Sequence, residues 1–214
     1  MDVVRLGIGP LTPAEVVAVA RDGVRVEVTD ECLDAVGATR RHVEALAAAE
    51  RPVYGVSTGF GALATKHIPV ERRAQLQLSL IRSHAAGSGP EVEREVVRAL
   101  MLLRLSTLCT ARTGVRPIVV QTYAAALNAG ITPIVREYGS LGCSGDLAPL
   151  AHCALALLGE GEVRDASGAV RPAGEALAAA GIDPLTLAEK EGLALINGTD
   201  GMLGMLVLAC HDFG

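Results

Sequence analysis

The chain has 214 residues, a formal net charge of −5 and a hydrophobic content of 50%. That is enough apolar material for the core of one large domain or two small ones. The negative charge and an aromatic content of only 2% argue against nucleic acid as a partner, because binding it needs basic surfaces and stacking rings.

Composition and local pattern also argue against a secreted protein, a membrane protein and a disulfide-linked protein. The acidic Asp2 and the lack of a long apolar run near the N-terminus argue against a signal peptide. We expect no membrane partner, because polar residues such as Asn197 interrupt the apolar runs and a span needs about 20 residues. The 5 cysteines form no CxxC pair, so we expect reduced thiols, with no disulfide framework and no metal site. These features predict a cytoplasmic protein.

The sequence predicts mainly helices, in an order set by local signals. The string 12–15 (TPAE) has the form of a capping box, and Pro117 suits the first position of another helix. Valines that alternate with charged residues predict a strand, and Ser167-Gly168 predicts a hairpin turn. The expected elements are helices from Pro13 to Gly23, over about 30–50, over 71–86, through Leu100 to near Gly114, from Pro117 to Asn128, over about 146–158 and over 202–210, an alanine-rich helix before Asp183, a strand over 24–28 and a hairpin between Val163 and Val170.

Polar loops that carry glycine stand out against these apolar helices. They are 54–61 (YGVSTGFG), 142–146 (GCSGD) and 197–199 (NGT), and a fourth polar feature is the pair Ser83-His84 at the end of a helix. Taken singly, each loop could be an ordinary turn in which glycine adopts a positive φ. Neither GxGxxG nor a P-loop lysine is present, so the glycines do not predict a phosphate site. We expect His152, on an apolar helix, to be a satisfied core or interface residue.

Together the loops resemble the signatures of the aromatic amino acid ammonia-lyases. The string GSLGCSGDLAPLAH (139–152) is the most specific, with YGVSTGFG upstream and GLALINGT (192–199) downstream in the order and spacing of that family. The resemblance covers essentially the whole chain. It implies a mainly α fold, in which an N-terminal helical domain with short β elements leads into a long helical bundle, and a homotetramer.

The resemblance also implies a prosthetic group made from the chain itself, 4-methylidene-imidazol-5-one, formed from Cys143, Ser144 and Gly145. The nitrogen of Gly145 would attack the carbonyl carbon of Cys143, and Ser144 would lose water to leave an electrophilic methylidene. Only glycine leaves that nitrogen unhindered and the backbone free to bend so sharply. The family usually has alanine in place of Cys143, but ring closure needs only the carbonyl of that residue. No external cofactor is required.

Other roles carry over position by position. Tyr54 resembles the catalytic tyrosine of the family, and Asn197 resembles the asparagine that hydrogen-bonds near the prosthetic group and the substrate. Asp146 resembles the acid beside the ring, which assists its formation. Gly59 and Gly61 would let the tyrosine loop close over the site.

The substrate choice depends on His84, which in this family faces the ring of the substrate. Ser83-His84 resembles the branch that cleaves histidine, which implies L-histidine as substrate and trans-urocanate as product. An imidazole donor or acceptor suits an imidazole ligand, and a hydrogen-bonding pocket rejects an apolar analogue. A tyrosine or phenylalanine ammonia-lyase and a 2,3-aminomutase with the same prosthetic group remain alternatives, and so does an inactive truncated remnant.

Family members are more than twice as long as this chain. We therefore expect residues 1–214 to be the N-terminal part of an aromatic amino acid ammonia-lyase domain, ending within the first bundle helices. The remainder would supply the arginine that holds the substrate carboxylate. We therefore expect this fragment alone to be inactive.

Overall fold

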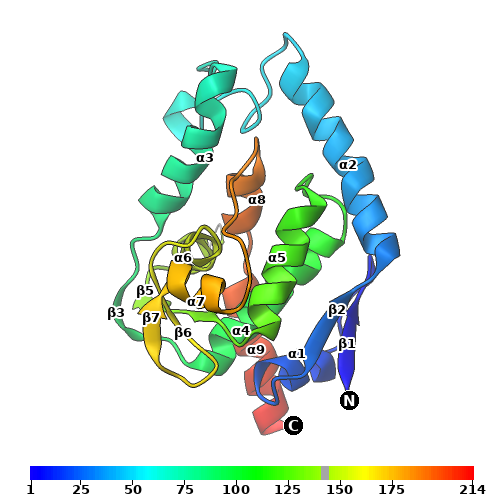
Figure 1. The fold of residues 1–214 in the computed structure, drawn as a ribbon, viewed down its shortest axis with the longest axis vertical. Helices are drawn as coiled ribbons and strands as arrows, with labels where there is room; N and C mark the ends of the chain where they lie inside the picture. The colour runs from blue at the N-terminus through cyan, green and yellow to red at the C-terminus, as the bar shows by residue number, and fades with distance from the viewer. Residues whose placement is uncertain (141–144) are drawn as a thin grey trace.

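The structure, a computed structural model, describes residues 1–140 and 145–214. It is mainly α with short strands, as the sequence predicts (Figure 1). The helices are α1 (Pro13–Ala20), α2 (Asp30–Ala48), α3 (Val70–His84), α4 (Arg94–Cys109), α5 (Pro117–Asn128), α6 (Leu147–Leu157), α7 (Ala173–Ala179), α8 (Glu191–Ile196) and α9 (Asp200–Phe213), with a 3-10 turn at Gly61–Leu63. The strands are β1 (Val3–Leu6), β2 (Arg25–Val28), β3 (Ser88–Glu91), β4 (Thr132–Pro133), β5 (Arg136–Tyr138), β6 (Glu162–Arg164) and β7 (Val170–Pro172).

Helix starts follow the local signals closely. Thr12 caps α1 through a complete capping box with Glu15, and Pro13 is the first helical residue. Pro117 likewise opens α5. Both prolines suit the first helical position, where a backbone donor would have no partner within the helix. These two predictions are therefore confirmed to the residue.

The strand pairings are less local. The hairpin prediction is confirmed, because β6 and β7 pair in antiparallel around Gly168, whose φ is +85°. The predicted strand over 24–28 is β2, but its parallel partner β1 was not predicted. The segment after α3 forms strand β3, which was not predicted, and pairs in antiparallel with β5.

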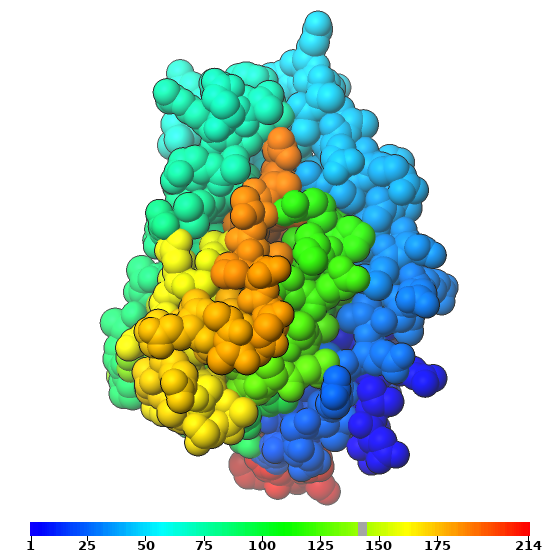
Figure 2. Space-filling view, in the orientation of Figure 1, coloured from blue at the N-terminus to red at the C-terminus, as the bar shows by residue number. Residues whose placement is uncertain are grey.

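Helix α4 runs through the middle of the hydrophobic core. Its leucines at 100, 102, 105 and 108 are buried, and they belong to one apolar cluster that also includes side chains of α1, α5, α6 and α9. In Figure 1, α8 lies between α3 and α5, and α9 continues from it toward the C-terminus. Figure 2 shows the segment from α7 to α8 on the surface between α3 and α5.

The stretch Glu191–Phe213 is longer and more apolar than we expected. Its length and its mean hydropathy of 1.6 would suffice for a membrane span, which corrects the expectation that no apolar run reaches that length. However, 39% of its most apolar window is buried inside the protein, and residues 197–199 divide it into α8 and α9. One such stretch, selected by length and composition alone, is weak evidence for a membrane partner.

Candidate active site

The Gly145–Asp146 backbone lies directly against the loop between α8 and α9. The Asp146 amide donates to the carbonyl oxygen of Gly198 at 2.6 Å. Gly145 has a φ of +126°, and a Cβ added there would lie 2.7 Å from the same oxygen. Both the backbone conformation and the lack of space therefore require glycine at this position. Two of the three predicted loops thus meet in space.

The carboxylate of Asp146 joins three segments. Asp146 is only 1% exposed, and it accepts a hydrogen bond from the Ser140 hydroxyl at 2.6 Å. Its other oxygen accepts from the Met202 amide in the first turn of α9 at 2.9 Å. A carboxylate is favoured at a helix N-terminus, where free amides point at it. Asp146 therefore ties the segment before α6 to α9, and its expected role in ring formation stays a prediction.

Arg104 and Asp200 lie beneath residues 197–199, and the motifs did not identify them. The Arg104 guanidinium binds the Asp200 carboxylate and donates to the Ala194 carbonyl at 3.1 Å. Burial raises the pKa of Asp200, and the charge of Arg104 opposes that shift. One signal could have found Arg104, because it is the lone cation within the apolar run MLLRLSTLC and buried cations are almost always paired, but the same signal does not identify Asp200.

Tyr54 lies on the loop between α2 and α3, with 53% of its surface exposed. Its hydroxyl accepts from the Gly61 amide at 3.4 Å, and its ring meets Phe60 edge-on with centroids 6.0 Å apart. A Cβ on Gly55 would lie 3.1 Å from Leu193 of α8, so the tyrosine loop packs on that helix.

The predicted loop glycines have different structural roles. A Cβ on Gly59 would lie 2.6 Å from the Cβ of Leu63, so only glycine allows the loop to fold back on the 3-10 turn. Gly61 has a φ of +53° with open space around it, so its backbone conformation favours glycine. Both glycines therefore shape the loop that carries Tyr54.

His84 is the last residue of α3 and is half-buried. Its Nδ1 lies 2.9 Å from the carbonyl oxygen of Leu80 and 3.0 Å from the Ser83 hydroxyl. A carbonyl only accepts, so Nδ1 carries the proton, and Nε2 of the neutral ring is left as an acceptor. Three residues after His84, at Gly87, the chain contacts α6.

In this contact the Gly87 amide donates to Nε2 of His152 in α6 at 3.1 Å. Burial lowers the pKa of His152, and the charge of Arg136 lowers it further. A neutral His152 is what an accepting Nε2 requires. His152 is half-buried and has a hydrogen-bond partner, which agrees with the expectation of a satisfied core or interface residue.

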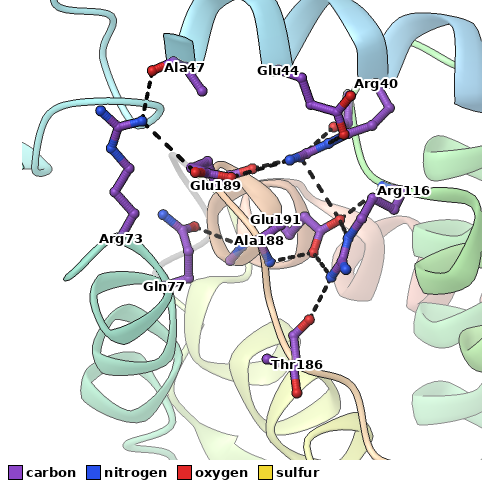
Figure 3. A network of polar contacts seen from close by, with 12 residues as sticks. Arg40, Glu44, Ala47, Arg73, Gln77, Arg116, Thr186, Ala188, Glu189 and Glu191 are labelled. Atoms are coloured by element: carbon purple, nitrogen blue, oxygen red, sulfur yellow. Dashed lines mark hydrogen bonds and ion pairs between the residues drawn. The ribbon is translucent and has the colours of Figure 1, made fainter. Parts of the chain in front are cut away.

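Asn197 ends α8, and its side chain is exposed. The helix that carries it has only six residues, too few to be stable in isolation. Its position is therefore set by contacts with its neighbours. Figure 3 shows the polar network that makes these contacts.

Glu191, the first residue of α8, is fully buried at the centre of this network. Its carboxylate accepts from the Arg116 side chain at 2.9 and 2.8 Å and from the Ala188 amide at 2.7 Å. The neighbouring Glu189 faces Arg40 at 3.3 Å and Arg73 at 3.9 Å. Acidic groups at the start of α8 are thus matched by arginines from α2, α3 and the segment before α5.

Helix α3 is linked directly to α8 by one buried contact. The Gly192 amide donates to the side-chain oxygen of Gln77 at 2.9 Å. A Cβ on Gly192 would also lie 2.9 Å from that oxygen, so glycine is needed for the approach. Gln77 lies two turns before His84, and Gly192 lies five residues before Asn197. The contact therefore fixes the helix of one predicted site residue against the helix of the other.

The structure brings together part of the predicted site. Gly145, Asp146 and the 197–199 loop are in contact, and the Tyr54 loop and α3 both pack on α8. Within the described ranges no hydrogen bond joins the side chains of Tyr54, His84 and Asn197, and no cluster of His, Cys, Asp or Glu could hold a metal. Cys143 and Ser144 lie outside the residues that the structure describes.

The described part of this junction, Gly145 and Asp146, fits the glycine end of the prosthetic group expected at residues 143–145. Its C-terminal residue must be glycine on two independent grounds, the positive φ and the contact with Gly198. A buried carboxylate, Asp146, adjoins it. The helical scaffold, the three loops that carry glycine and this junction agree with the class of protein that the sequence resembles.

The chain belongs to the aromatic amino acid lyase family, whose model matches residues 11–214. It is 65% identical to the histidine ammonia-lyase of Streptomyces coelicolor over 99% of this chain and 41% of that protein. It is 48% identical to the tyrosine ammonia-lyase of Cupriavidus metallidurans, over 92% of this chain and 37% of that one.

A solved structure shows the same arrangement of elements. The tyrosine aminomutase of Streptomyces globisporus matches with a TM-score of 0.90 at 40% identity, covering 97% of this chain and 39% of that one. The chain thus spans about two fifths of the length of the proteins it matches.

Proposed function

We propose that the full-length protein containing this chain eliminates ammonia from L-histidine to give trans-urocanate. The observation that carries the proposal is the junction of Gly145 and Asp146 with the 197–199 loop, and His84, at the end of α3, is the residue that we propose recognises the substrate ring. The 65% identity to a histidine ammonia-lyase supports histidine over tyrosine, whose curated lyase is 48% identical.

We propose that the electrophile is 4-methylidene-imidazol-5-one formed from Cys143, Ser144 and Gly145. A bond forms from the Gly145 nitrogen to the Cys143 carbonyl carbon, whose oxygen leaves as water, and Ser144 loses its hydroxyl as a second water. The group supplies an electron-poor carbon that no ordinary side chain offers, and the protein positions it. The bend at Gly145 and its contact with Gly198 favour this ring closure.

The chain's own residues bind and orient the substrate. Nε2 of His84 accepts a hydrogen bond from the imidazole N–H of histidine, because Nδ1 is already committed to Leu80. The Asn197 amide offers donors and an acceptor beside Gly198, and the Tyr54 hydroxyl moves a proton near the substrate. Asp146 stays buried and holds the backbone in place.

The same proposal includes the rest of the lyase domain, the oligomeric state and the location of the protein. Residues 1–214 form the N-terminal part of the lyase domain, and the remaining length of the relatives supplies the rest of the site. The full-length protein is a cytoplasmic homotetramer. The alternative is an aminomutase, favoured by the similarity to the tyrosine aminomutase structure.

The test uses the full-length protein, its intact mass and its products. The wild type should weigh two water molecules less than its sequence, and it should release ammonia and urocanate from L-histidine. Ser144→Ala should have the unmodified mass and no turnover, because alanine has no hydroxyl to lose. An unmodified mass in active wild-type protein would contradict the prosthetic group, and a β-amino acid product would favour the aminomutase.

A further inference from the structure

The loop between α8 and α9 rests on a buried ion pair. Arg104, in the middle of α4, is 1% exposed, and Asp200, the first residue of α9, is 6% exposed. The guanidinium binds the Asp200 carboxylate and the Ala194 carbonyl, so it contacts a residue on each side of the loop. The Thr107 hydroxyl, one turn along α4, lies 3.4 Å from the other carboxylate oxygen.

The loop backbone lies directly on this pair. A Cβ added to Gly198 would overlap the Arg104 guanidinium and the Asp200 carboxylate, so only glycine fits. On its other side, Gly198 accepts from the Asp146 amide and adjoins Gly145. The ion pair therefore fixes the position of the Gly198 carbonyl. That carbonyl accepts from the Asp146 amide, directly after Gly145 of the 143–145 tripeptide.

Stability alone is a poor explanation for such a pair. The cost of removing two charges from water offsets much of their attraction, and apolar residues of similar volume often stabilise a core equally well. A guanidinium differs from them because its donors have fixed directions and bind several acceptors at once. That property suits a side chain that must fix the end of α8 relative to the start of α9.

We propose that Arg104 and Asp200 are positioning residues for the 197–199 loop and, through Gly198, for the backbone at Gly145 and Asp146. The proposal rests on the proposed function, because the tripeptide matters chemically only if the prosthetic group forms there. Within the described part of the chain, no hydrogen bond joins either residue to Gly145. Both act through one carbonyl group.

The experiment compares three variants of the full-length protein. Arg104→Lys keeps the charge but loses the fixed directions of the guanidinium donors, and Asp200→Asn keeps the shape but loses the charge. The matched control is Arg98→Lys, because Arg98 lies on the same helix and is 2% exposed. Arg98 donates to the Val19 and Leu127 carbonyls, away from the loop.

Three readouts separate positioning from general stability. We expect faster hydrogen exchange at the Asp146 amide, a fraction of unmodified mass, and a kcat lowered about tenfold to a hundredfold in Arg104→Lys. Asp200→Asn should change all three in the same direction. Arg98→Lys should lower the thermal midpoint while leaving the exchange, the mass and kcat as in the wild type.

A folded Arg104→Lys protein with wild-type exchange at Asp146, wild-type mass and wild-type kcat would overturn the proposal. So would an Arg98→Lys protein with the same losses. If Arg104→Lys does not fold, Asp200→Asn decides by the same readouts. A wild type without mass loss and ammonia release would refute the proposed function instead, and the exchange at Asp146 would still decide whether the pair positions the loop.

Discussion

His84 ends α3 with one ring nitrogen already in use. Because Nδ1 faces the Leu80 carbonyl, the ring offers Nε2 to a ligand as an acceptor. A histidine substrate has an imidazole N–H to donate to it, and phenylalanine has none. A site that leaves its own polar group unpaired discriminates strongly against the apolar ligand.

Replacing His84 by Phe in the full-length protein should therefore shift substrate preference. We expect kcat/KM for L-histidine to fall roughly tenfold to a hundredfold, the loss of about 1–3 kcal/mol for one polar contact, and activity on phenylalanine to change far less. Steady-state assays with both amino acids measure this. His42→Phe, the same change at an exposed residue of α2, is the control, and a His84→Phe variant that keeps its histidine preference would remove His84 from the ring pocket.

Single residues were predictable where the residue type itself carries the requirement. The family resemblance implied Gly145 as part of the prosthetic group, and the bend that ring closure needs explains why the residue is glycine; the structure shows its positive φ and its contact with Gly198. Arg104 was not predicted, because an arginine in an apolar run shows that a partner exists but not which one. Its partner Asp200 lies 96 residues away in the chain.

Helix α8 is an element that its own sequence cannot stabilise. Six residues are too few for a helix to persist in water. Its first residue, Glu191, supplies a buried carboxylate to Arg116, and its second, Gly192, donates to Gln77. The direction of α8, and hence the place of Asn197, follows from these contacts.

Glu191→Gln should consequently destabilise the protein more than Glu189→Gln. The first change removes a fully buried charge from a guanidinium and two backbone amides, at a cost of about 1.5–3 kcal/mol per charged hydrogen bond. Glu189 is partly exposed, and its side-chain ion pairs are longer. Thermal midpoints of the two variants provide the comparison. Equal midpoints, or a larger drop for Glu189→Gln, would contradict the central place of Glu191.

Elements were predicted well where their signals are local. The capping box at Thr12 and the proline at 117 each act within one helical turn, so the helices begin where expected. The pairing of β3 with β5 joins Ser88 to Tyr138, and no local pattern specifies such a partner. Parallel pairing of β1 with β2 was missed for the same reason.

The molecule as a whole exposes an apolar face on α9. Its exposed large apolar residues are Met202, Leu203, Met205, Leu206 and Phe213. Exposed apolar side chains that gather on one helix of a protein are a sign of an interaction surface. Since the chain spans about two fifths of its relatives, much of their length is available to cover such a face.

The 214 residues expressed alone should have no ammonia-lyase activity. Their α9 face would lack its cover, and the family resemblance places the arginine for the substrate carboxylate outside this chain. Losing that charge-assisted contact costs about 1.5–3 kcal/mol of binding. Urocanate absorbance with L-histidine measures the outcome, beside the full-length protein as positive control. Clear turnover by the 214 residues, free of host lyase, would show that the other segments are dispensable.

The sequence by itself determined the family, the glycine loops and most helix starts, because each depends on residue types at short spacing. It also singled out Tyr54, His84, Gly145, Asp146 and Asn197. Only the tertiary structure showed that Gly145 and Asp146 meet the 197–199 loop, and that Arg104 and Asp200 lie beneath it. Those contacts join α4, α6 and α9 across long stretches of chain, and their partners are selected by packing and burial of the whole core, which no local pattern encodes.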